Sequence, residues 1–405
     1  MSVNKGFWKS GHTPTLLSAF LYFDIAFMIW VMLGPLAVQI AQDLHLTPAQ
    51  KGLMVATPVL AGALLRMLMG VLVDHLKPKK AGLIGQLIVI AALATAWLHG
   101  IENFQQILIL GISLGFAGAA FAVALPLASR WYPPQHQGTA LGIAGAGNSG
   151  TVFAALFAPM LAAAYGWGNV FGMALIPLSL ALLVYMIFAK DAPECPAPKS
   201  LHQYLNVLKD KDAWWFMFFY AVTFGGFVGL ASSLTIYFND QYGMSPVHAG
   251  YFTAASVFAG SLVRPMGGAL ADRIGGIRTL LVVYAFAALF LLVISFGMPT
   301  KELALLVFIL AMISLGFGNG AVFQLVPQRF RKEIGVMTGL VGMAGGVGGF
   351  YLAASLGVIK GATGSYQIGF LIFAGLALLA LFGLGSVKTR WRTTWGAATV
   401  AGAKV

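Results

Sequence analysis

Two arginines in apolar surroundings are the residues of this sequence that could do chemistry. Arg66 lies in the run Leu60–Asp74 and Arg264 in the run Arg264–Asp272, and in both runs a glycine follows four residues later and an aspartate eight residues later. A permanent cation inside a membrane helix costs at least about 2.5 kcal/mol, so each side chain needs a partner. A guanidinium binds flat or tetrahedral oxyanions through two parallel N–H donors. The duplicated arginines therefore predict a site for one small anion.

The composition places the chain in a lipid bilayer. Hydrophobic residues make up 59% of the 405 residues and charged residues 9%, against about 25% charged in soluble domains. Apolar runs long enough to cross about 30 Å of hydrocarbon recur twelve times, near residues 16–40, 52–74, 81–99, 104–129, 138–164, 168–189, 213–238, 248–271, 279–298, 302–326, 335–358 and 365–387. The first run exceeds a signal-peptide core, so we take it as a span. We expect an all-α membrane protein with twelve transmembrane helices.

The net charge of +12 reflects the placement of basic residues rather than an affinity for nucleic acid. With twelve spans, 19 of the 24 Lys and Arg fall on one side of the membrane, and only Lys51, Lys301 and Lys360 fall on the other. The positive-inside rule then places both termini in the cytoplasm. We expect a multi-pass monomer of the cytoplasmic (inner) membrane with no nucleic-acid partner.

Cysteine and histidine give no sign of a metal site. The one cysteine, Cys195, lies in a polar loop, and the seven histidines fall in loops or at span ends without ligand spacing. We therefore expect no metal and no cofactor. The spans also lack a Ser/His pair or paired carboxylates, so we do not expect an enzyme.

The sequence repeats itself after six spans. The four residues Ser113–Phe116 recur unchanged as Ser314–Phe317. Three glycines that begin at Gly138 recur with the same spacing from Gly335. We divide the chain into a bundle of residues 1–190, a cytoplasmic linker of residues 191–212 and a bundle of residues 213–405. Parallel repeats of this kind hold their substrate near the bilayer midplane, between the halves.

Glycines at helical spacing mark one helix in each half as a tightly packed or sliding element. Small residues every three or four positions let helix backbones approach closely. The glycines we assign to packing and gating are Gly142, Gly145, Gly147, Gly339, Gly342 and Gly345. In the first of these helices Asn148 needs a polar partner because no water is present, and we expect it at the site. Asn319 is a further candidate of the same kind.

Other charged and aromatic positions carry open alternatives. Tyr220 faces either the site or the membrane interface. Asp24 is the acidic residue that lies well inside an expected span, so it either exchanges protons or serves as a fixed counter-ion or cap. Asp74, and Asp272 with Arg273, suit a cytoplasmic latch that pairs charges in one conformation and releases them in another.

The motifs resemble known transporters over the whole chain. The pattern from Gly268 to Arg278, with a degenerate copy from Gly70 to Lys80, resembles the loop signature of the major facilitator superfamily. The glycine-rich stretches Ala144–Gly150 and Gly339–Gly349, with an arginine in spans two and eight, resemble the nitrate/nitrite porter family more narrowly. The fold implied is two six-helix halves related by a pseudo-two-fold axis.

The resemblance implies roles for individual residues. Arg66 and Arg264 would clamp the anion, Tyr220 and Phe121 would sandwich it, and Asn148 would bond nearby. The function implied is transport of nitrate, with nitrite as a second substrate, by alternating access. The carboxylate Asp24 in span one favours proton-coupled import. A nitrate/nitrite antiporter, or a carrier of another small anion, stays open as an alternative.

Overall fold

The protein folds into two bundles of long helices. The structure is a computed structural model that describes residues 7–193, 206–330 and 333–396. After a short 3-10 turn at Phe7–Lys9, the first half contains α1 (Thr13–Trp30), α2 (Leu33–Asp43), α3 (Pro48–Leu76), α4 (Pro78–His99), α5 (Phe104–Gly118), α6 (Phe121–Ser129), α7 (Pro134–Gly145), the 3-10 segment η2 (Ala146–Ser149), α8 (Gly150–Tyr165) and α9 (Trp167–Phe188). The second half contains α11 (Lys211–Tyr242), α12 (Pro246–Leu262), α13 (Arg264–Ile274), α14 (Gly276–Ser295), α15 (Lys301–Arg329), α16 (Ile334–Thr363) and α17 (Gln367–Thr393).

These helices account for the expected spans. Eleven helical stretches in the described residues are long and apolar enough to cross a membrane. The remaining expected span, residues 248–271, is divided at Val263 into α12 and α13. The all-helical fold predicted from sequence is confirmed, whereas most of the linker expected at 191–212 lies outside the described residues.

Several spans are broken where the sequence interrupts the backbone ladder. Pro35 has no N–H to bond the carbonyl of Val31, and the Gly34 N–H takes that carbonyl instead at 2.9 Å, which separates α1 from α2. Pro265 likewise has no N–H to bond back to α12, and α13 begins beside it at Arg264. The break between α5 and α6 falls at Ala119 and Ala120. Trp30 is the last residue of α1 at the first of these breaks, and Arg264 is the first residue of α13 at the second.

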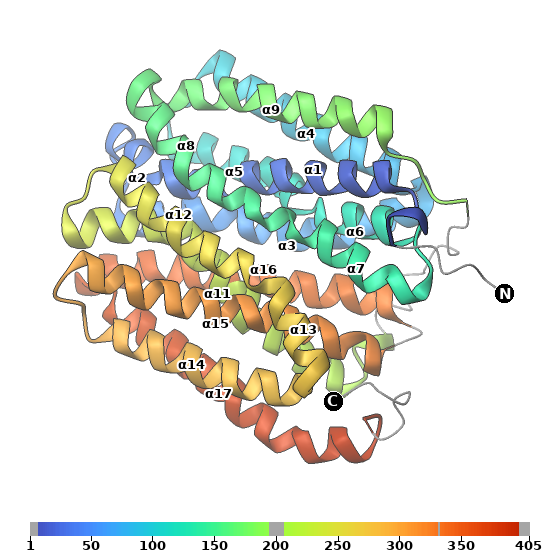
Figure 1. The fold of residues 1–405 in the computed structure, drawn as a ribbon. Coiled ribbons are helices and arrows are strands. Elements are labelled where there is room, and N and C mark those ends of the chain that lie inside the picture. The colour runs from blue at the N-terminus through green and yellow to red at the C-terminus, as the bar shows by residue number, and fades with distance from the viewer. Residues whose placement is uncertain (1–6, 194–205, 331–332, 397–405) are drawn as a thin grey trace.

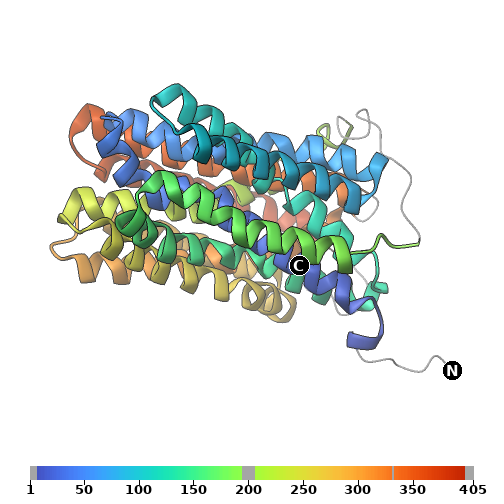
Figure 2. The same ribbon diagram turned by 90° about the horizontal axis from the view of Figure 1, so that it is seen from above.

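The two halves meet along a long interface. In Figure 1, α1–α9 gather in the upper part of the molecule and α11–α17 in the lower part, and Figure 2 looks down on the first half with the second half behind it. Across the boundary α3 packs on α16, α8 on α12, and α2 on α11. Gly52 and Gly357 show how closely the backbones approach, because a Cβ on Gly52 would lie 2.7 Å from the Gly357 Cα. Only glycine fits at such a contact.

The two ends of the bundle are tied in different ways. We call the end where α1 begins at Thr13 the near end (right in Figure 1) and the end where α2 finishes at Asp43 the far end. At the near end, ion pairs stay within one half: Arg130 pairs with Asp74 at 3.4 Å in the first half. At the far end, Lys51 of α3 pairs with Asp240 of α11 at 3.0 Å. Among the described residues, this is the ion pair that joins the two halves.

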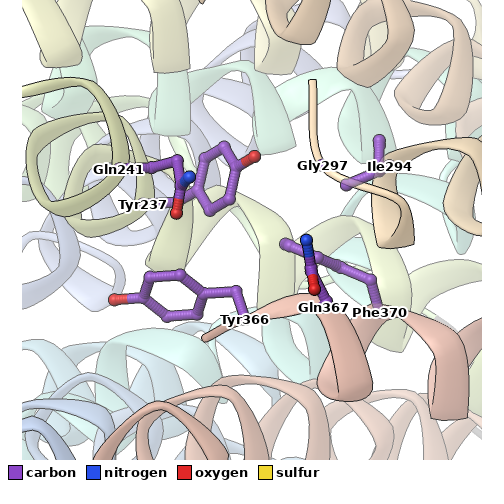
Figure 3. Close-up of a pocket in the computed structure, with 7 residues that line it drawn as sticks. All are labelled: Tyr237, Gln241, Ile294, Gly297, Tyr366, Gln367 and Phe370. Atoms are coloured by element: carbon purple, nitrogen blue, oxygen red, sulfur yellow. The ribbon is translucent and has the colours of Figure 1, made fainter. Parts of the chain in front are cut away.

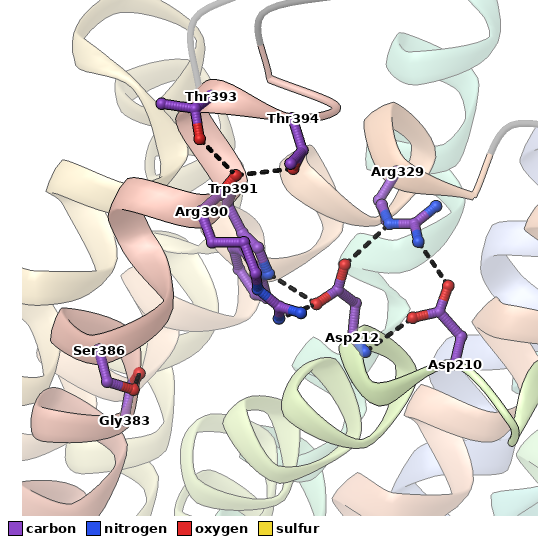
Figure 4. A network of polar contacts seen from close by, with 9 residues as sticks. All are labelled: Asp210, Asp212, Arg329, Gly383, Ser386, Arg390, Trp391, Thr393 and Thr394. Carbon is purple, nitrogen blue, oxygen red and sulfur yellow. Dashed lines mark hydrogen bonds and ion pairs between the residues drawn. The ribbon is translucent and has the colours of Figure 1, made fainter.

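A buried carboxylate organises the near end of the second half. Asp212 accepts from Arg329 Nε at 2.9 Å and from Trp391 Nε1 at 2.8 Å, and it also pairs with Arg390. Asp210 accepts from Arg329 Nη2 at 2.5 Å. Figure 4 shows this network joining the start of α11 to the ends of α15 and α17. It fixes helices of one half to each other, and none of the ion pairs found at this end in the described residues joins the two halves.

The far-end ion pair has support from a tyrosine of the second half. Tyr366 Oη donates to Asp240 at 2.7 Å. Burial, and after it the Asp240 carboxylate, raises the pKa of the Tyr366 hydroxyl above its ordinary value, so the hydroxyl stays protonated and can donate. Tyr366 also borders a small pocket with Tyr237, Gln241 and Gln367 (Figure 3). Asp240 is thereby held in place for Lys51.

Candidate functional site

Arg66 lies at the boundary between the halves and is almost fully buried. Its side chain is 2% exposed. The Nε donates to the Gly118 carbonyl at 3.2 Å, and Nη1 donates to the Gly342 carbonyl at 2.5 Å. The second contact crosses from α3 of the first half to α16 of the second. The third nitrogen, Nη2, is buried without a hydrogen-bond partner among the described residues, so it is free to bind a ligand.

Aromatic rings surround the Arg66 guanidinium. Its Cζ lies 5.1 Å from the centroid of the Phe121 ring, 5.2 Å from that of Trp30 and 5.4 Å from that of Phe224. A cation on the face of an aromatic ring gains up to about 2 kcal/mol when water is excluded. The three rings therefore offset part of the cost of burying this charge.

Arg264, in the second half, lies near Phe224, which is one of the three rings around Arg66. Its Nη2 donates to the Tyr220 Oη at 3.2 Å, and its Cζ lies 6.0 Å from the centroid of Phe224. Tyr220 stacks on Phe224 with centroids 5.0 Å apart. Nη1 is buried without a partner in the described part of the chain. Because both guanidiniums share one ring, the structure brings the two predicted arginines together.

The two arginines lack a protein counter-ion. In the described residues neither forms an ion pair with a carboxylate. Asp24 is one candidate for a counter-ion from the sequence. Its carboxylate instead accepts from Ser149 Oγ at 2.7 Å and from the Gly150 backbone N–H. Buried charges in proteins are paired or coordinated. Arg66 is buried and Arg264 is half-buried, and each has one buried guanidinium nitrogen without a partner among the described residues, so the pair is suited to bind a small anion between them.

Phe323 completes the wall of the site. Its ring centroid lies 4.9 Å from that of Tyr220 in its own half and 6.2 Å from that of Phe121 in the other half. Phe121, at 5% exposed, and Tyr220, at 1%, are buried. Tyr220 is thus buried beside Arg264 in the bundle, and its role in binding the anion stays a prediction.

Sequence reasoning missed Phe224, Trp30 and Phe323. Phe224 follows Tyr220 by four residues, so both lie on one face of α11. That spacing could have identified Phe224 once Tyr220 was chosen. Trp30 and Phe323 give no such signal, because only the packing of their helices brings them to the arginines.

The two predicted asparagines are buried, and neither is among the hydrogen-bond partners found for the arginines. Asn148 is 1% exposed and lies in η2, where its amide nitrogen can donate to the carbonyls of Gly145 and Ala146 at 3.3 Å each. Asn319 is fully buried in α15, and both of its amide atoms lack a partner among the described residues. A role for either in binding the anion stays a prediction.

The six gating glycines divide into different environments. A Cβ on Gly147 would meet Phe23 at 2.7 Å, and one on Gly345 would meet Tyr220 at 2.6 Å. A Cβ on Gly142 or Gly145 would meet no described atom within 4 Å. Gly339, in α16, is half-buried.

Gly342 belongs to the site itself. Its carbonyl accepts from Arg66, and a Cβ there would lie 3.5 Å from Phe121. The sequence grouped Gly342 with Gly145 as an equivalent packing position. In the structure the two residues of the repeat meet different neighbours, and their role in packing and gating stays a prediction.

The residues expected to form a near-end latch are only partly paired. Asp74 pairs with Arg130 of its own half. Asp272 and Arg273 are exposed on α13 and form no ion pair with a described residue. Their opening and closing with the transport cycle stays a prediction.

The sequence has close relatives of known class. The family model of the Major Facilitator Superfamily matches residues 17–353. The chain is 33% identical to the nitrite extrusion protein of Bacillus subtilis over 87% of its length and 88% of the relative's. It is 32% identical to a probable nitrate transporter of Staphylococcus carnosus (90% and 92% covered) and 30% identical to a probable nitrate/nitrite antiporter of Thermus thermophilus (89% and 88% covered).

Solved structures share the fold at low sequence identity. A bacterial homolog of the human lysosomal transporter Spinster superposes with a TM-score of 0.69 at 18% identity, covering 94% of this chain and 97% of the other. The human organic anion transporter MFSD10 gives a TM-score of 0.69 at 16% identity, covering 92% and 99%. The chain therefore belongs to the Major Facilitator Superfamily and, within it, to the family of bacterial nitrate and nitrite transporters.

Proposed function

We propose that the protein carries nitrate, and also nitrite, across the cytoplasmic membrane by alternating access. The observation that carries this proposal is the pair of guanidiniums, Arg66 buried in one half and Arg264 half-buried in the other, that share Phe224 and lack a carboxylate partner among the described residues. A small planar anion can accept N–H bonds from both arginines and stack against aromatic rings at once. The names of the relatives supply the identity of that anion.

The orientation follows from the basic residues. The near end carries most of the lysines and arginines, so we place it in the cytoplasm together with both termini. The far end then faces outward, where Lys51 and Asp240 join the halves. This ion pair must separate whenever the site opens outward. The two side chains are only 13% and 18% exposed, and the cost of removing such charges from water offsets much of their attraction, so the pair biases the cycle without locking it.

Proton-coupled import is our first choice for the transport mode. Asp24 bonds Ser149 and Gly150 at the break between η2 and α8, so a proton on its carboxyl group would change the bonding of a helix that lines the boundary between the halves. The second candidate is nitrate/nitrite exchange. It is favoured by the same contacts, because an Asp24 committed to capping α8 needs no proton for transport.

Uptake of labelled nitrate into proteoliposomes tests both levels of the proposal. The assay is run with and without an inward pH gradient and with and without internal nitrite. We expect the wild type to accumulate nitrate in response to the gradient. We expect Asp24→Asn, which mimics the protonated carboxyl group, to exchange anions but to lose gradient-driven accumulation.

Ser149→Ala is the matched control for that variant. It removes the hydroxyl that donates to Asp24 and keeps the carboxyl group, so we expect it to retain accumulation. Full accumulation by Asp24→Asn would instead assign Asp24 to capping and favour exchange. Absence of any nitrate or nitrite flux in the wild type would overturn the proposed function.

A further inference from the structure

Trp30 occupies a slot made by two glycines. It is the last residue of α1, before the break that separates α1 from α2, and it is fully buried. A Cβ on Gly62 of α3 would lie 2.6 Å from the indole Nε1, and a Cβ on Gly118 of α5 would overlap the ring. No other residue type fits at either position without moving the indole. Two helices of the first half are therefore shaped around this side chain.

The indole is fixed by directional contacts as well as by shape. Its Nε1 donates to the Pro58 carbonyl of α3 at 2.6 Å. Phe27 packs edge-on against it, with ring centroids 4.8 Å apart and the planes 74° apart. A buried tryptophan needs a partner for its N–H, and here that bond also sets the rotation of the ring.

The fixed indole lies against Arg66. The Arg66 Cζ is 5.2 Å from the centroid of the Trp30 ring. Gly118, which borders the indole, also supplies the carbonyl that accepts from Arg66 Nε. Trp30, Gly118 and Arg66 thus interlock, and a displaced indole would disturb both the ring contact and the carbonyl that orient the guanidinium.

We propose that Trp30 is a positioning residue of the anion site: it fixes the plane of the Arg66 guanidinium so that Nη2 stays available to the substrate. This inference rests on the proposed function, since it assigns a role in binding the transported anion. The indole acts through Arg66, and its contribution is the orientation of that cation. A tryptophan that only filled the core would affect stability and leave anion affinity unchanged.

The test compares two buried tryptophans that both donate a hydrogen bond. Trp30→Phe keeps an aromatic face and removes the N–H. Trp391→Phe is the matched control, because Trp391 is equally buried and donates to Asp212 at the near end, in a network that does not include either site arginine. The KM and the maximal rate of nitrate uptake are measured in proteoliposomes at equal amounts of folded protein, with the melting temperature of each purified variant.

We expect Trp30→Phe to raise the KM by about tenfold, with a smaller change in maximal rate. We expect Trp391→Phe to lower the melting temperature and leave the KM within about twofold. Trp30→Leu, which also removes the ring face, should raise the KM further. If the Trp30 variants do not fold, Gly62→Ala takes their place, because its Cβ displaces the indole without deleting it, and it should raise the KM in the same way.

Two results would separate the possible failures. A wild type that carries nitrate together with a Trp30→Phe variant of unchanged KM would overturn this inference alone and assign Trp30 to the core. A wild type that neither binds nor carries nitrate would overturn the proposed function and this inference with it.

Discussion

Each half contains a helix with the site arginine and a glycine-rich helix, but a different one of the two is broken in each half. In the first half the arginine helix α3 is continuous, whereas the glycine-rich helix is interrupted by η2. In the second half the arginine helix is interrupted before Arg264, whereas the glycine-rich helix α16 is continuous. Part of the difference is one residue: Met67 follows Arg66, but Pro265 follows Arg264. A proline ends the helix that precedes it.

The breaks give the two arginines different degrees of constraint. Arg66 projects from an unbroken helix, bonds two backbone carbonyls and touches three rings. Arg264 starts a new helix, bonds the hydroxyl of Tyr220 and touches one ring. We infer that Arg66 is the fixed member of the clamp and that Arg264 is the more adaptable one. Sequence symmetry thus yields an asymmetric site.

Replacing each arginine by lysine tests that asymmetry with the largest effects. Lysine keeps the charge and loses the planar fork. We expect Arg66→Lys to weaken nitrate binding by about 100-fold and Arg264→Lys by about tenfold, because the ammonium cannot serve two carbonyls, three rings and the anion together. Equilibrium binding to the purified protein measures both. Equal losses would contradict the distinction, and near-normal binding would remove that arginine from the site.

The glycines of α16 allow the two arginines to be disturbed separately. A Cβ on Gly345 would meet the Tyr220 ring at 2.6 Å, so Gly345→Ala should displace the support of Arg264 and weaken binding by about twentyfold. Gly342→Ala is the comparison on the Arg66 side of the site, because its Cβ would meet Phe121 at 3.5 Å and Arg66 Nη1 at 3.6 Å in ordinary contacts. We expect a change within about twofold there. A larger loss of affinity in Gly342→Ala would show that Arg66 tolerates less displacement than these contact distances suggest.

Removal of the Tyr220 hydroxyl isolates the hydrogen bond of Arg264. Tyr220→Phe keeps the stack on Phe224 and removes the hydroxyl oxygen that accepts from Arg264 Nη2. We expect nitrate affinity to fall by about fivefold, because a hydrogen bond to a charged group is lost. Tyr284→Phe is the control, since Tyr284 is buried in the same half and donates to the Phe219 carbonyl. An equal effect in both variants would point to a general loss of packing.

A variant that makes the helix continuous before Arg264 should have the smallest effect on nitrate affinity. Pro265→Ala restores an N–H that can bond back to α12, so the helix can run on through Val263. We expect affinity to change by about twofold and the maximal uptake rate to fall, because Arg264 loses freedom to move. Pro177→Ala, inside α9, is the comparison. A variant with unchanged rate would show that the break has no part in the cycle.

The sequence was sufficient for the fold and for the two arginines that the structure brings together. Length and hydropathy fix the number of spans, because each must cross the same thickness of hydrocarbon. The repeat points to Arg66 and Arg264, because a buried cation is costly enough to be informative wherever it occurs. Tyr220 and Phe121 followed from the family resemblance. These features depend on residue type and local spacing, which a sequence displays directly.

Tertiary structure alone decided how the arginines are held. The Gly342 carbonyl that accepts from Arg66 is 276 residues away in the chain. Every residue has a backbone carbonyl, so the sequence does not indicate which one will lie beside Arg66. The partners of Trp30, Asp24 and Lys51 are hidden for a related reason, because each depends on which helices pack together. The sequence by itself determined which groups are too costly to bury alone. Packing between distant helices determined what accompanies them, since a contact between two segments is a property of neither segment.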